Sequence, residues 1–115
     1  MRTTVAADLA EVSIALYEET AAKWRLCLER EMELESARPL VKSEAVRRIM
    51  ETENPDAGKP HSATSAEKVV ESDAEYAEFL RTLRGVVINK HEAAAATEAA
   101  KLRAKLALVL AGGAL

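Results

Sequence analysis

Aromatic residues, cysteine, glycine and proline are all scarce in this chain of 115 residues. It contains one tryptophan, two tyrosines, one phenylalanine, one cysteine, four glycines and three prolines. The single cysteine, Cys27, excludes a disulfide within the chain and mildly favours the cytosol. Aromatic side chains supply much of the area that compact cores bury. With so few of them, the chain is expected to pair long helices lengthwise, both internally and with other copies of itself.

Long uncharged apolar runs are also missing. The N-terminal stretch carries Arg2 and Asp8 and has no apolar segment typical of a signal peptide. The uncharged run after Lys105 is shorter than the roughly 20 residues that span a bilayer. The net charge of −3 is ordinary for a cytosolic protein and argues against a generally basic nucleic-acid coat. We therefore expect a cytoplasmic protein with no membrane partner.

Residues 4–51 are predicted to form a helical arm, because apolar residues recur there at steps of three and four. Two neighbouring rows make a face wide enough to contact more than one helix. The rows are Val5, Leu9, Val12, Leu16, Trp24, Cys27 and Leu34, and Ile14, Tyr17, Ala21, Leu28 and Met32. Pro39 predicts a kink or break, since the residue before a proline is disfavoured in the helical region.

A polar crossover is predicted over about 52–63, where Pro55, Gly58 and Pro60 interrupt the helical pattern. A capping box at Thr64–Glu67 predicts the restart of helix, and a long C-terminal helix is expected over about 64–111. A second capping box at Ser72–Glu75 leaves open a separate short helix before the main one. A nearly heptad row then follows: Tyr76, Phe79, Leu80, Leu83, Val86, Val87, Lys90, Ala93, Ala94, Thr97, Ala100, Ala104 and Leu108.

These patterns predict one all-α domain over residues 1–115. Its expected form is an antiparallel hairpin of two long helices, joined by the kinked polar crossover and assembled as a coiled-coil-like homo-oligomer.

Catalytic and metal-binding motifs are not found in the sequence. Gly58-Lys59 does not form a phosphate-binding loop, because Pro60 stands where that loop needs serine or threonine. His61, His91 and Cys27 lack the paired spacing of a metal site. The acidic residues between Glu29 and Glu35 alternate, so a helix spreads them over several faces. We expect no enzymatic activity, no metal and no cofactor.

Charge is distributed unevenly along the chain. From Asp8 to Glu35 there are eight acidic and three basic residues, a net charge of −5, whereas Arg38–Arg48 carries a net +3 and Arg81–Lys105 a net +4. One interpretation is electrostatic pairing between helices. The other is a basic surface that follows a phosphate backbone. The crossover adds groups that hold phosphates, namely Lys59, His61, Ser62, Thr64, Ser65 and Lys68.

The segment RRIMETENPDAGKPHSATSAEKVVESDAEYAEF, followed by a long C-terminal helix, resembles small phage-encoded recombination mediators of the UvsY type. The resemblance covers about 40–108. It implies a ring-forming helical protein that binds single-stranded DNA and helps a recombinase load against a single-strand-binding protein. The residues that it implies would face the DNA are Arg47, Arg48, Lys59, Lys68, Arg81 and Arg84. The first functional hypothesis is therefore a DNA-binding accessory protein of recombination; the alternative is a structural oligomerisation or adaptor protein with no nucleic-acid role.

Overall fold

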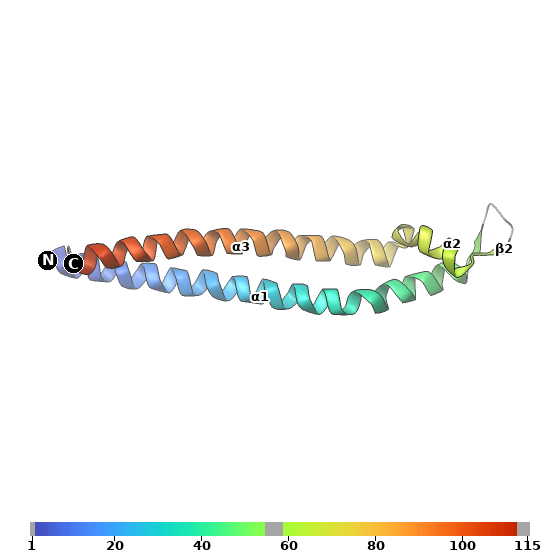
Figure 1. Ribbon diagram of the computed structural model, residues 1–115, viewed down its shortest axis with the longest axis horizontal. Helices are drawn as coiled ribbons and strands as arrows, with labels where there is room; N and C mark the ends of the chain where they lie inside the picture. The colour runs from blue at the N-terminus through green and yellow to red at the C-terminus, as the bar shows by residue number, and fades with distance from the viewer. Residues whose placement is uncertain (1, 55–58, 113–115) are drawn as a thin grey trace. The chain divides into compact units, whose positions relative to one another are not determined.

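The computed structural model describes residues 2–54 and 59–112, which are almost entirely helical (Figure 1). The prediction of an all-α protein is confirmed. The predicted turn around Gly58 lies outside the described residues. In chain order the elements are helix α1 (Arg2–Met50), strands β1 (Glu53–Asn54) and β2 (Lys59–Pro60), helix α2 (Ala63–Lys68), the 3-10 helix η1 (Val70–Ser72) and helix α3 (Ala74–Gly112).

The chain divides into two compact units. Unit 1 comprises the described residues of Met1–Arg30 and Val87–Leu115, so it combines the beginning of α1 with the end of α3. Unit 2 is Glu31–Val86 and contains the rest of both long helices together with the short elements.

Pro39 does not end the first helix, so of the predicted kink or break the break is wrong, and the kink stays a prediction. Helix α1 continues through Pro39 for a further eleven residues, up to Met50. Proline lacks the N–H that would bond the carbonyl four residues earlier. The helix tolerates this loss because the residues on both sides, among them Glu35 and Ala45, belong to types that favour helix.

Helix α1 ends in a closed turn followed by a small strand pair. The hydroxyl of Thr52 donates to the carbonyl of Ile49 at 2.7 Å, and its backbone N–H donates to the same carbonyl at 3.0 Å. Both bonds satisfy an acceptor that the helix end would otherwise leave open. Strands β1 and β2 then pair antiparallel, with Asn54 opposite Lys59.

The N-cap of α2 is Ser62, two residues before the predicted Thr64. The Ser62 hydroxyl accepts the backbone N–H of Ser65 at 3.1 Å, and Ser62 has the extended backbone typical of an N-cap. Thr64 lies inside α2, where its hydroxyl cannot serve the first turn, so the predicted capping box is wrong.

The long C-terminal helix begins at Ala74 and not near Thr64, because η1 separates α2 from α3. Asp73, and not Ser72, caps α3: its carboxylate accepts the backbone N–H of Tyr76 at 2.9 Å. The Ser72 hydroxyl instead donates to the carbonyl of Val69 at 2.5 Å and closes η1. The separate short helix that the sequence left open is therefore present.

Unit 2 has a core of large side chains. Tyr76 and Val70 are buried around Ala45, and the neighbouring side chains that pack against them are Val41, Val46, Ile49, Phe79 and Leu80. The rings of Tyr76 and Phe79 stack with their centroids 6.4 Å apart. The Tyr76 phenol and, to a smaller extent, the charge of Glu35 raise the pKa of the Arg38 guanidinium. The phenol thus has a polar partner although its ring is buried.

Unit 1 is built differently, because its buried residues are small. Its buried positions are Ala10, Thr97, Ala100, Ala104 and Ala107, each between 3% and 7% exposed. The Thr97 hydroxyl donates to the carbonyl of Ala93 at 2.7 Å, which satisfies it inside its own helix. Small side chains let helix backbones approach closely but bury little apolar area.

Candidate interaction surfaces

Arg48 forms an ion-pair network in unit 2. Its Nε and Nη2 atoms donate to the two carboxylate oxygens of Asp73 at 3.1 and 2.8 Å, and its Nη1 lies 3.1 Å from Oε2 of Glu75. The Asp73 side chain is only 11% exposed, whereas that of Glu75 is largely exposed. The two-pronged bond to Asp73 is therefore the stronger contact, since paired N–H groups match a carboxylate in both distance and direction.

The same network gives Asp73 its unusual acidity. The hydrogen bond from Arg48 lowers the pKa of the Asp73 carboxyl, and the backbone N–H of Tyr76 lowers it further, although partial burial acts in the opposite direction. Asp73 thus has two roles: it caps α3 and it binds the last turn of α1. Arg48 is a structural residue of unit 2 in this arrangement.

The other cations expected to face DNA also lie in unit 2, but they differ in their surroundings. Arg81 is paired with Glu78 of its own helix, with Nη2 2.6 Å from Oε2. Arg47 in α1, Lys68 at the end of α2 and Arg84 in α3 are exposed. Lys59 lies in β2. Arg47 and Arg48 are adjacent on one helix and so point about 100° apart, which separates the exposed cation from the paired one.

The hydroxyl groups of the crossover are used locally. Ser62 caps α2, and the Ser65 hydroxyl lies 2.7 Å from Nδ1 of His61. Thr64 is exposed. A shallow groove beside this segment is lined by Lys42, Ser43, Val46, Ala63 and Glu67, which places a cation and a carboxylate along the same opening.

Three or more histidine, cysteine, aspartate or glutamate side chains do not gather into a metal-binding group anywhere in residues 2–54 and 59–112. Within these residues, too, none of the helices combines the length with the apolar content that crossing a membrane requires.

Eight large aliphatic side chains of unit 1 are exposed in two rows, which together we call the leucine face. It consists of one row on α1 (Val5, Leu9, Val12 and Leu16) and one row on α3 (Leu102, Leu106, Val109 and Leu110), all between 38% and 68% exposed. On α1 the steps are four, three and four residues, and on α3 they begin with four and three. These are the steps of a heptad seam.

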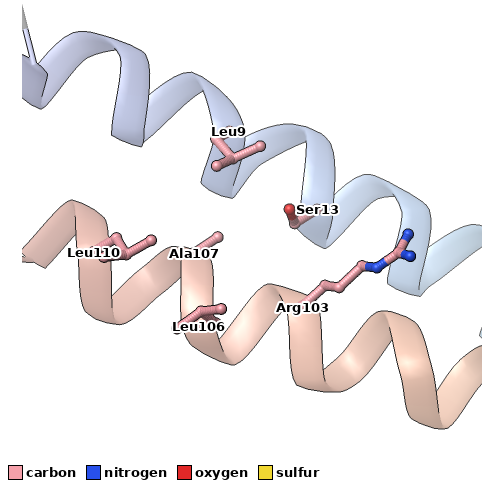
Figure 2. A pocket seen from close by; sticks show the side chains of 6 residues that line it. All are labelled: Leu9, Ser13, Arg103, Leu106, Ala107 and Leu110. Carbon is pink, nitrogen blue, oxygen red and sulfur yellow. The ribbon is translucent and has the colours of Figure 1, made fainter.

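A groove joins the two rows. Its lining comes from Leu9 and Ser13 on α1 and from α3 residues that include Leu106 and Leu110, as Figure 2 shows. Arg103 lines the same groove, and its long side chain extends towards α1 (Figure 2). The groove therefore has an apolar floor with a cation at its edge, and both helices contribute to it.

An ion pair marks the end of the α1 row. The next two seam positions after Leu16 are Glu19 and Lys23, whose charged groups lie 3.4 Å apart. Leu26 resumes the spacing and is exposed, but it is separated from Leu16 by this charged pair. The continuous apolar row on α1 thus covers about two heptads.

The heptad row predicted for the C-terminal helix is confirmed at Tyr76, Leu83, Thr97, Ala100 and Ala104, which are buried. Its last member, Leu108, is half exposed, and Ala107 takes the buried position. The exposed row Leu102, Leu106 and Val109 was not predicted from the sequence. Its spacing was the available signal, but the spacing alone does not show which of two rows on a helix faces the same chain.

Comparisons of the chain with protein-family models, with curated proteins and with solved structures found no match.

Proposed function

We propose that this protein is a non-enzymatic assembly protein: an antiparallel helical hairpin that forms a homo-oligomer through coiled-coil-like packing of its leucine face. The observation that carries the proposal is the inverted distribution of side chains in unit 1, where alanines such as Ala104 are buried and leucines such as Leu106 are exposed. Burial of a leucine side chain contributes about 1.5–3 kcal/mol, so a partner that covers this face gains substantial free energy.

The test is the mass of the protein in solution. Light scattering of the wild-type protein over a range of concentrations is expected to give a multiple of the 12.5 kDa chain mass. The double substitution Leu102→Lys/Leu106→Lys places charges on the leucine face and is expected to raise the dissociation constant by about 100-fold or more.

Leu40→Lys is the matched control, because Leu40 is as exposed as Leu102 but belongs to unit 2. It is expected to leave the mass unchanged. Circular dichroism of both variants checks that the helices persist. A wild-type protein that is monomeric at every concentration contradicts the proposal.

Single-stranded DNA binding is the second candidate, and it corresponds to the mediator-like accessory role that the UvsY-type resemblance implies, with a recombinase or a single-strand-binding protein as further partners. The exposure of Arg47, Lys68 and Arg84 supports it, because exposed cations are available to phosphates. The ion pairs of Arg48 and Arg81 weigh against equal roles for all six predicted residues.

A labelled oligonucleotide tests this second function. Binding at low salt that weakens as salt rises, and that Arg47→Glu/Arg84→Glu reduces by about tenfold or more, supports it. Arg25→Glu, which changes an exposed cation in unit 1, is the control. If the wild-type oligomer binds no oligonucleotide at low salt, the DNA-binding role is excluded and the assembly role stands alone.

A further inference from the structure

The part of α3 in unit 1 is apolar on two opposite sides. At about 100° per residue, the row Leu102, Leu106 and Val109 points roughly 170° away from the buried alanines of the same helix. One side is covered inside unit 1 and the other is exposed. A helix that is apolar on both sides normally packs against neighbours on both. The α3 row therefore lacks one neighbour.

Charged side chains flank the two rows with opposite sign. On α3, Arg103 and Lys105 are exposed and occupy the two positions that border the Leu102–Leu106 step. On α1, the exposed Asp8 borders the row beside Leu9. Glu19, at the seam position after Leu16, is neutralised by its ion pair with Lys23. In helical seams, the charges at these bordering positions choose the partner and its orientation.

These charges distinguish two ways of pairing two copies. If each row met its own counterpart, Arg103 and Lys105 would face the same two cations of the second copy, and Asp8 would face Asp8. Like charges in contact are destabilising. If the α1 row of one copy met the α3 row of the other, Asp8 would approach Arg103 or Lys105 instead.

We propose that a second copy of this chain covers the leucine face, with the α1 row of each copy packed against the α3 row of the other. The proposal rests on the self-assembly proposed above and specifies its contact. A two-fold axis makes the same contact twice, so each copy supplies one acidic and one basic edge. Arg103, at the edge of the groove, lies where it can meet the acidic edge of the partner.

The exposed area is sufficient for a stable pair. From their exposures of 38% to 68%, the two rows of the leucine face together expose on the order of 800 Å² of accessible surface per copy, which is about what one partner of a standard interface buries. A typical monomer exposes no apolar patch larger than about 300–600 Å². A second copy is thus large enough to account for the whole face.

Site-directed cross-linking tests the pairing. In a Cys27→Ala background, Asp8→Cys and Lys105→Cys give two proteins with one cysteine each, at exposed positions beside the two rows. The two proteins carry different tags, are unfolded together, refolded and oxidised. The proposed pairing predicts mainly the mixed disulfide, whereas pairing of like rows predicts disulfides between identical chains.

Charge reversal gives a second measurement that does not depend on disulfide geometry. Arg103→Glu/Lys105→Glu is expected to raise the dissociation constant about tenfold at low salt, and adding Asp8→Lys is expected to restore part of the loss. Under like-row pairing the first variant leaves the constant unchanged, because two acidic edges repel as two basic edges do. Either that result or disulfides only between identical chains overturns the proposal while self-assembly stands.

The mass of the wild-type protein separates this failure from that of the proposed function. A monomer at all concentrations overturns both proposals. A monomer that binds vesicles containing anionic lipid would also overturn both, since the leucine face and its cations would then serve a membrane surface.

Discussion

Unit 2 buries several large side chains, whereas unit 1, among its described residues, buries only alanines and one threonine and exposes most of its large aliphatic residues. In unit 2 the core around Tyr76 is joined to an ion-pair network and a capped helix start. In unit 1 the described buried residues are small, and the side chains of the leucine face are exposed. Unit 2 thus buries large apolar side chains within one chain, whereas unit 1 leaves most of its own exposed.

The largest effect is expected from Tyr76→Ala, which removes the central side chain of the unit 2 core. Truncation of a buried aromatic residue costs about 3–5 kcal/mol of unfolding free energy. Hydrogen exchange is expected to show loss of amide protection over Glu31–Val86 first. The fluorescence of Trp24, the single tryptophan and a residue of unit 1, is the control. If unit 1 lost its protection at the same time, the two cores would not be separate.

Enlarging a buried alanine tests how tightly the helices of unit 1 pack. Ala104→Leu inserts a large side chain into the close-packed seam of unit 1 and is expected to cost about 1–3 kcal/mol, measured by urea denaturation. The same change at the exposed Ala99 is the control and is expected to be nearly neutral. If Ala104→Leu were stabilising, the space around the buried alanines of unit 1 would be large enough to hold a leucine side chain.

Asp73 provides a smaller effect that depends on pH. Asp73→Ala removes the cap of α3 and is expected to cost about 1–2 kcal/mol at pH 7. Asp73→Asn keeps a good cap and loses only the ion pair, so it separates the two roles.

The sign of the pH dependence follows from the lowered pKa of Asp73 in the folded protein. The extra stability is fully present above the unfolded-state pKa of about 3.9 and is lost as the pH falls through the folded value. The difference in unfolding free energy between the wild type and Asp73→Asn is expected to be constant above about pH 5 and to shrink below about pH 4. A difference that grew towards low pH would contradict this assignment.

The smallest expected effect is a gain in the free energy of unfolding. Gly85 lies inside α3, and a Cβ atom there would meet no described atom within 4 Å. Gly85→Ala is expected to stabilise the protein by about 0.5–1 kcal/mol, because glycine is a poor helix former. Thermal denaturation measures it. Destabilisation would indicate that this position is covered in the assembly.

The sequence predicted the helices and one of the two α3 rows, because periodic apolar residues and good helix formers dominate the chain. It failed at local positions where competing contacts decide. Pro39 continues α1 because the helix on both sides outweighs one lost hydrogen bond. Ser62 and Asp73 cap the two helices in place of the expected Thr64 and Ser72. Several hydroxyl and carboxyl groups near each helix start could accept the same backbone N–H, and the sequence does not show which one does.

The candidate surfaces were harder to predict than the fold. A large aliphatic residue is expected inside, so the spacing of Leu106 in the sequence does not reveal that it is exposed while the neighbouring Ala107 is buried. The pairing of Arg48 with Asp73 joins residues 25 positions apart and depends on how α3 begins. The runs of charged residues therefore predicted where the cations lie, but not which of them form ion pairs within the chain.

The ion pair between Glu19 and Lys23 has a consequence for the size of any assembly. It interrupts the α1 row after about two heptads, so the continuous apolar row is short and ends at a charged pair. An apolar row that continued along the helix could pair in several registers and bind further chains, which would form a filament. A short row in a two-fold contact is fully covered by one partner. Replacing both charged residues with leucine would lengthen the apolar row. Light scattering is then expected to show a broad range of masses in place of one defined oligomer mass.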